Sequence, residues 1–338
     1  MEGLGESMSL KPVIKWALSI GLLWVLYQVV DWEKSYELLK QMKIYPVVVG
    51  VLMVIVFEVI NAQKIRFIFR DPRLNLKRMT QINFLTRFFN NLAPGGVGGD
   101  VLRIYYIGQT IKYNSKAFGG VLIDRLTGFW VQFGLGTIAL TVLYGTLWAK
   151  GVALVLGVML LLGGVLFSLY LFPRLIDKIQ VVLNWINKRL GWSLKFDGSV
   201  KSLLGEVFRN KLLAIKILGI DLVYKNSVNA VVMLLIYGLG YQLSFFEVTL
   251  IMFVNATVAM LPISIGGIGV TELSFGYMFH TFGLDSEIGV VISLLIRIVT
   301  LPSVLVGWFL FMKERPSIKK NMDVIRKQKR AAHASAVE

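Results

Sequence analysis

Apolar runs that approach or exceed the length of a membrane-spanning helix recur along this chain of 338 residues, and they restrict its fold more than any other feature. About 20 apolar residues in a helix cross the hydrocarbon core of a bilayer. Hydrophobic residues make up 56% of the chain, and its mean hydropathy is +0.67. We therefore predict an all-α polytopic membrane protein.

The charged residues predict how the chain sits in the membrane. Lys and Arg outnumber Asp and Glu by 36 to 20, and most of the excess lies between and after the apolar runs. We attribute this charge to membrane topology and contact with anionic headgroups, because no nucleic-acid-binding motif is present. By the positive-inside rule, residues 64–78 and 313–330 lie in the cytoplasm. We expect a multi-pass protein of the plasma (cytoplasmic) membrane with both termini inside.

The residue types also limit the chemistry. The chain contains no Cys and only two His, so a disulfide framework, thiol chemistry and a zinc or haem centre are not expected. We predict no metal site and no cofactor, although this composition leaves open a cation held by carboxylates.

The apolar runs predict six spanning helices and two shorter re-entrant hairpins in one transmembrane domain, residues 12–312. The predicted spans are residues 12–30, 44–62, 117–148, 151–172, 212–237 and 288–312. An N-terminal tail covers residues 1–11, and a basic cytoplasmic segment with an amphipathic helix covers 174–211. Residues 313–338 form a basic cytoplasmic tail.

The segment Asn90–Arg103 interrupts the apolar pattern with a proline and four glycines. Irregular backbone at membrane depth is tolerated only where protein or a water-filled cavity covers it. The flanking arms, residues 79–92 and 100–111, reach about 18–21 Å as helices at ~1.5 Å per residue. This is short of the ~30 Å hydrocarbon core, so we predict a hairpin that enters and leaves on one face.

A weaker copy of this break lies at Pro262–Glu272, within a second predicted hairpin at residues 248–282. Gly95-Gly96-Val97-Gly98 matches Gly266-Gly267-Ile268-Gly269 at an offset of 171, and Arg125 aligns with Arg297 at 172. The charge distribution places the two hairpins on opposite faces. We predict an inverted repeat of residues 44–148 and 212–312, which is typical of alternating-access transporters.

The two breaks predict an anion site. A new helix begins after each break, and the free N–H groups at its start favour a negative ligand. Arg125 and Arg297 lie inside apolar spans, where each costs about 2.5–3.5 kcal/mol unless it meets a partner or water. Arg also suits bidentate binding of phosphate. The candidate substrate-binding residues are Asn90, Asn91, Pro94, Gly95, Gly96, Gly98, Gly99, Asp100, Arg103, Asp124, Arg125, Asn255, Pro262, Gly266, Gly267, Gly269, Glu272 and Arg297.

Structural roles are the alternative for several of these residues. Gly and Pro in membrane helices also permit close packing or a kink. Arg125 can be neutralised by Asp100, Asp124 or Glu58 in a salt bridge, and Asp100 can serve only as an N-cap. The three Asn can cap freed carbonyls rather than touch a substrate.

Two further charges, Asp221 and Lys225, lie four residues apart in the span at residues 212–237. We interpret them as an ion pair on the helix surface in preference to a site for a coupling ion.

Pro94–Arg103, Asp124-Arg125 and Pro262–Glu272 together resemble the flippase-like membrane domain of the lysylphosphatidylglycerol synthase family. The resemblance covers about residues 10–313. It implies movement of an anionic lipid between leaflets, by analogy with the step that exposes lysylphosphatidylglycerol on the outer surface. We expect no soluble aminoacyl transferase domain after Met312, so the resemblance does not carry the lysyl-transfer reaction or the identity of the lipid to this chain.

We predict a non-enzymatic translocator of a phosphate-bearing lipid, of the phospholipid or polyprenyl-phosphate type. Its partners would be that lipid and the membrane, and not nucleic acid. An enzyme that supplies the lipid and assembly into a homo-oligomer are compatible with this prediction. The alternatives are a secondary transporter of a small soluble anion and an intramembrane lipid-metabolising enzyme in which carboxylates act as acid and base.

Overall fold

The computed structural model describes residues 21, 24–28, 30–92, 98–145, 151, 198–260, 264 and 266–334, and in these ranges the regular structure is helical. The predicted all-α membrane fold is confirmed. Four segments are long and apolar enough to span a bilayer: α3 (Ile44–Phe69), α6 (Asn114–Tyr144), α10 (Lys211–Gly238) and Ser286–Glu314 within α13 (Ser286–Ala334). They correspond to four of the six predicted spans.

The remaining predicted segments lie wholly or mostly outside the described residues. These are the N-terminal tail, the spans at residues 12–30 and 151–172, and most of the basic segment at 174–211. The end of that basic segment is described and forms the helix α9 (Gly198–Arg209). Before α3, the short helix α2 (Trp32–Gln41) is capped by the Asp31 side chain, which accepts from the Lys34 N–H.

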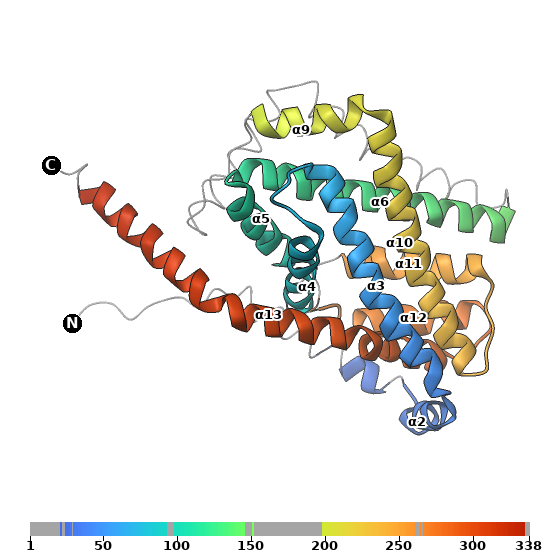
Figure 1. The fold of residues 1–338 in the computed structure, drawn as a ribbon. Coiled ribbons are helices and arrows are strands. Elements are labelled where there is room, and N and C mark those ends of the chain that lie inside the picture. Colours follow the sequence, from blue (N-terminus) through green and yellow to red (C-terminus); the bar gives the residue numbers. More distant parts are fainter. Residues whose placement is uncertain are drawn as a thin grey trace, which may run out of the picture.

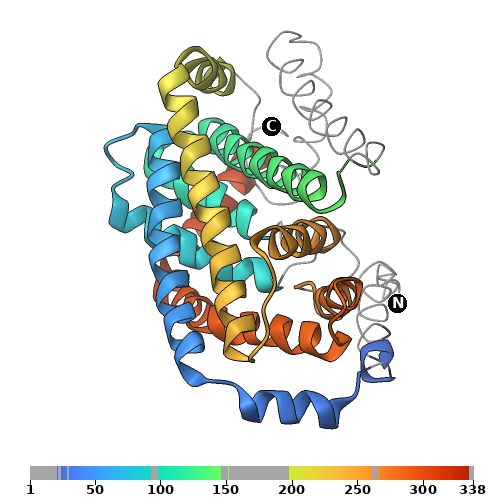
Figure 2. The same cartoon turned by 90° about the vertical axis from the view of Figure 1, so that its right-hand side faces the viewer.

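The helices α3 and α10 pack side by side and run in opposite directions (Figures 1 and 2). The Lys43 N–H just before α3 donates to the carbonyl of Gly238 at the end of α10, with an N···O distance of 3.2 Å. The long helix α6 crosses behind this pair in Figure 1. An antiparallel relation between α3 and α10 is what the inverted repeat requires, but the repeat itself stays a prediction.

Four shorter helices form two hairpins, as the broken apolar pattern predicts. The first joins α4 (Leu76–Leu92) to α5 (Gly98–Ile111), and the second joins α11 (Phe245–Ala259) to α12 (Val270–Thr281). The helix α13 packs against α4 and α12, so it contacts both hairpins. Beyond the predicted span it continues as one helix through the basic tail to Ala334 and projects from the bundle (Figure 1).

The buried apolar side chains form two large clusters at opposite ends of the bundle. One includes Ile65 of α3 and Ile217 of α10, and the other includes Val54 of α3 and Val231 of α10. The residues between these positions on the two helices include several charged side chains. A polar layer therefore separates the two clusters.

Candidate functional site

A polar cavity of about 220 Å³ lies in this layer and is lined by residues of α3, α4, α5, α6 and α10. Its lining residues are Glu58, Asn61, Lys64, Asn83, Thr86, Arg87, Asn90, Arg103, Asp124, Arg125, Gly128, Phe129, Asp221, Tyr224 and Lys225. On the three spanning helices the lining residues fall near the middle of the helix, at 58–64 on α3, 124–129 on α6 and 221–225 on α10. Charged groups inside a spanning helix are costly in a membrane unless they have partners or face water, and they often mark a functional site.

Lys64 joins the three spanning helices at the cavity wall. Its Nζ lies 2.7 Å from Oδ1 of Asp124 on α6 and 2.6 Å from Oδ1 of Asp221 on α10. Only 4% of Lys64 is exposed. The sequence placed Lys64 in the basic cytoplasmic flank after a span ending at Ala62, and this is wrong because α3 continues to Phe69 and buries the ammonium group between two carboxylates.

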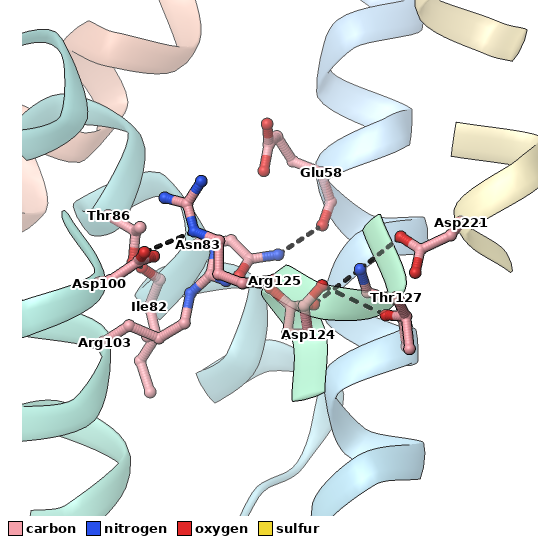
Figure 3. A network of polar contacts seen from close by, with 11 residues as sticks. Glu58, Ile82, Asn83, Thr86, Asp100, Arg103, Asp124, Arg125, Thr127 and Asp221 are labelled. Atoms are coloured by element: carbon pink, nitrogen blue, oxygen red, sulfur yellow. Dashed lines mark hydrogen bonds and ion pairs between the residues drawn. The ribbon is translucent and has the colours of Figure 1, made fainter. Parts of the chain in front are cut away.

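Arg103 and Arg125 bring the first hairpin into the same network. Arg103 donates from Nη1 to Oδ2 of Asp124 at 2.7 Å, and Arg125 donates from Nε to Oδ2 of Asp100. Figure 3 shows Asp124 between Arg103 on one side and Asp221 on the other. Asp100 therefore neutralises Arg125, which confirms one of the structural alternatives. The Arg125 side chain nevertheless keeps 37% of its surface exposed and lines the cavity.

A third arginine lines the cavity from α4. Arg87 donates from Nη1 to Oε1 of Glu58, a residue of α3 that is only 3% exposed. Nearby, the Asn83 side chain donates to the Glu58 carbonyl at 3.1 Å. These contacts attach the first arm of the hairpin to the middle of α3.

Lys225 is the remaining cation of the cavity. The sequence suggested a surface ion pair between Lys225 and Asp221, and this is wrong because Asp221 accepts from Lys64 and is almost fully buried. Lys225 itself forms no ion pair with any residue that the structure describes, although it lines the cavity. In the part of the cavity wall that the structure describes, five cations thus face three carboxylates.

The second break forms a separate polar cluster. Arg297 donates from Nε to Oε1 of Glu272 at 2.7 Å and from Nη1 to the Gly266 carbonyl at 3.3 Å. The other Glu272 oxygen accepts from the Gly269 N–H at 2.7 Å, so this carboxylate caps the start of α12. Because a carboxylate of the chain occupies this helix start, α12 offers less to a bound anion than the sequence suggested.

The structure divides the predicted site residues into two groups. Asn90, Arg103, Asp124 and Arg125 line the cavity, and Asp100 lies directly behind Arg125. Gly98 and Gly99 begin α5, and the Gly99 N–H donates to Oδ1 of Asn90 at 2.8 Å. The Asn91 side chain caps the Arg87 carbonyl. Glu272, Arg297, Gly266, Gly267, Gly269 and Asn255 do not line the cavity.

Four predicted residues, Pro94, Gly95, Gly96 and Pro262, lie outside the described residues. Asn255 lies on α11, and its side-chain oxygen is buried without a hydrogen-bond partner in the described part of the chain. Gly266, Gly267 and Gly269 have φ angles of 60°, 72° and 85°, which explains why glycine is needed there without any contact to a substrate.

Sequence reasoning missed several cavity residues, chiefly Lys64, Arg87, Asn83, Thr86 and Tyr224. Lys64 and Arg87 carried a usable signal, since each is a charge within or next to an apolar helix. Lys64 was assigned to the flank because five more basic residues follow it closely, and Arg87, which lies in the predicted hairpin arm at residues 79–92, was given no role. The uncharged residues carried no such signal.

Comparison with known proteins agrees with the fold and the motifs. The family model described as "Lysylphosphatidylglycerol synthase TM region" matches residues 13–307. A membrane protein of the UPF0104 group from Pyrococcus horikoshii is 25% identical over 310 residues, which cover 84% of this chain and 91% of that protein. No solved structure matches the chain significantly.

Proposed function

The chain belongs to the lysylphosphatidylglycerol synthase transmembrane-region family, and from this premise we propose that it moves an anionic, phosphate-bearing lipid between the leaflets of the membrane. In this proposal the polar cavity receives the headgroup. The membrane is the plasma membrane, both termini lie in the cytoplasm, and a separate enzyme supplies the lipid.

The observation that carries the proposal is the surplus of cations in a cavity halfway along three spanning helices. A headgroup that crosses a bilayer must pass the hydrocarbon layer, where a bare charge is strongly disfavoured. A cationic cavity at this depth replaces the lost water with charge-assisted hydrogen bonds. Substrate sites of transporters commonly lie near the midplane for the same reason.

The cavity size favours a headgroup over a whole lipid. Pockets for drug-sized ligands measure about 300–1,000 Å³, whereas this cavity has about 220 Å³. The acyl or polyprenyl chains would therefore stay in the bilayer, beside the apolar outer surface of the spanning helices. Exposed apolar side chains such as Val48, Leu52 and Val56 of α3 provide such a surface.

We assign a headgroup contact in the cavity to Arg125, which is partly exposed to it and suits phosphate. Arg297, bound to Glu272 and Gly266 at the second break, would instead keep the second hairpin in position. The sequence suggested headgroup binding for both arginines. In this proposal only Arg125 binds the headgroup, and Arg297 has a structural role.

The test is lipid movement in sealed proteoliposomes that contain fluorescent phosphatidylglycerol in both leaflets, with dithionite reduction reporting exchange. Wild type should expose inner-leaflet label faster than empty vesicles. The double variant Arg125→Gln with Asp100→Asn removes the cation and leaves no unpaired carboxylate, and it should slow the exchange about tenfold or more, equivalent to 1.4 kcal/mol or more. Lys216→Gln, an exposed cation on α10 outside the cavity, should not.

Equal rates for wild type and the double variant would contradict the proposal. Uptake of a soluble anion such as inorganic phosphate without any lipid movement would instead favour a secondary transporter. Chemical conversion of the labelled lipid, detected by mass spectrometry, would favour an enzyme.

A further inference from the structure

The charges around the cavity can be counted pair by pair. With Asp100 included behind Arg125, four carboxylates of the described residues surround the cavity: Glu58, Asp100, Asp124 and Asp221. Each has a cation as partner. Glu58 pairs with Arg87, Asp100 with Arg125, Asp124 with Arg103 and Lys64, and Asp221 with Lys64.

Five cations belong to the same network, so one positive charge remains after this pairing. It belongs to Lys225, which has no ion-pair partner among the described residues. Lys225 lies one helical turn after Asp221 and lines the cavity beside Tyr224. Its ammonium group has three donors and no acceptor, so it can meet three oxygens of one ligand.

An uncompensated charge inside a membrane protein is costly, and a bound counter-charge removes that cost. A single negative charge makes this cavity neutral, whereas a doubly charged ligand leaves it negative. Phosphate diesters carry one negative charge. Phosphate monoesters carry close to two at pH values well above their second pKa of ≈ 6. The cavity charge therefore discriminates between two classes of anionic lipid.

We propose that Lys225 binds the phosphate and that the cavity selects lipids with a phosphodiester headgroup over lipids with a terminal phosphomonoester. This inference rests on the proposed function and narrows its substrate class. The selected class includes glycerol- or sugar-linked phosphate lipids, and the disfavoured class includes phosphatidate and free polyprenyl phosphate. Arg125 and Arg87 lie on the same cavity and would contribute further donors while retaining their carboxylate partners.

The test measures binding of two soluble short-chain lipids, dioctanoyl phosphatidylglycerol and dioctanoyl phosphatidate, to the detergent-purified full chain by calorimetry at pH 7. Wild type should bind the phosphatidylglycerol about tenfold more tightly. Lys225→Met makes the cavity neutral without a ligand, so both lipids leave it negative, and this variant should bind phosphatidylglycerol about tenfold more weakly than wild type does. The matched control Lys216→Met replaces an exposed residue of the same helix and should keep the wild-type affinity.

Asp221→Asn tests the charge count by making the cavity more positive, whereas Lys225→Met makes it less positive. Lys64 keeps Asp124 as a partner, and the cavity gains a second surplus positive charge. This variant should shift the preference toward phosphatidate. If it does not fold, the wild-type preference still tests the selection and Lys225→Met still tests the phosphate contact.

Equal affinity of wild type for the two lipids, or an unchanged affinity of Lys225→Met for phosphatidylglycerol, would overturn the inference. Selective binding of phosphatidylglycerol without exchange between leaflets would support the inference and contradict the proposed function. Exchange of both lipids between leaflets at equal rates, together with equal binding, would support the proposed function and contradict the inference.

Discussion

At the residue scale, the two hairpins share one ion-pair arrangement. Arg125 pairs with Asp100, and Arg297 pairs with Glu272, in each case through Nε and over 25 residues of chain. Both carboxylates occupy the third position of a helix that follows a glycine-rich break. A carboxylate in the first turn interacts favourably with the helix dipole, and it also compensates an arginine that the next long helix carries into the membrane.

We expect the Arg297–Glu272 pair to be strongly coupled. Arg297→Met leaves the Glu272 carboxylate, whose side chain is only 2% exposed, without its cation. Breaking a buried pair on one side costs about 3–5 kcal/mol. Glu272→Gln added to Arg297→Met should recover a large part of this loss, because Gln keeps the cap on the Gly269 N–H. Thermal unfolding in detergent of both single variants and the double variant measures the coupling. Strictly additive effects would show that the pair contributes little.

At the element scale, the second break packs against the end of the first hairpin. Gly266 lies so close to the Asn91 carbonyl that a Cβ atom at this position would be 2.6 Å from the oxygen. Its φ of 60° is also unfavourable for other residues. At this point the backbone of the second hairpin therefore lies directly against the backbone of the first. This contact explains one glycine of the motif as a packing requirement.

Gly266→Ala should destabilise the protein more than Gly240→Ala does. Gly240 has a φ of 86° but no atom near the position of its missing Cβ, so only the backbone conformation penalises Ala there. That penalty is about 1–2 kcal/mol, and the overlap with Asn91 adds to it in Gly266→Ala. Midpoints of thermal unfolding for the two variants provide the comparison. Equal decreases of the two midpoints would indicate that the contact between Gly266 and Asn91 contributes nothing measurable to stability.

Most of the helices could be predicted from the sequence, whereas the cavity residues that lie far from the glycine-rich motif could not. The boundaries of α5, α10 and α12 and the start of α3 follow from hydropathy, charge and glycine, which are local signals, whereas the end of α3 was placed too early because it carries buried charges. Arg103, Asp124 and Arg125 stood out because they flank the motif. Lys64 and Asp221 are 157 residues apart, and their pairing depends on α3 and α10 packing side by side. Without a second sequence or a structure, nothing links such distant positions.

At the scale of the whole molecule, the antiparallel packing of α3 and α10 determines which loops share a membrane face. The start of α3 and the end of α10 are joined by the hydrogen bond from Lys43 to Gly238. The end of α3 and the start of α10 therefore lie together at the opposite end of the pair (Figure 1). Basic residues follow α3 and precede α10, which favours the cytoplasm for that end.

Single cysteines test this arrangement, because the natural chain has none. We expect Lys43→Cys and Gln242→Cys, both at exposed positions, to react with a membrane-impermeant maleimide in intact cells. Pro72→Cys and Arg209→Cys should react only after permeabilisation. The chain without cysteine controls for background labelling. A different labelling pattern for Lys43→Cys and Gln242→Cys would contradict the antiparallel pair, while the reverse pattern at all four positions would invert the orientation alone.

The buried Lys64 has a mechanical consequence. Separating α3 from α6 or α10 would expose its two carboxylate contacts to hydrocarbon, which is among the most costly changes available to a membrane protein. We therefore expect these three helices to stay together as one unit. If the cavity opens toward each leaflet in turn, as the proposed function requires, the hairpins and α13 are the elements that we expect to move against this unit.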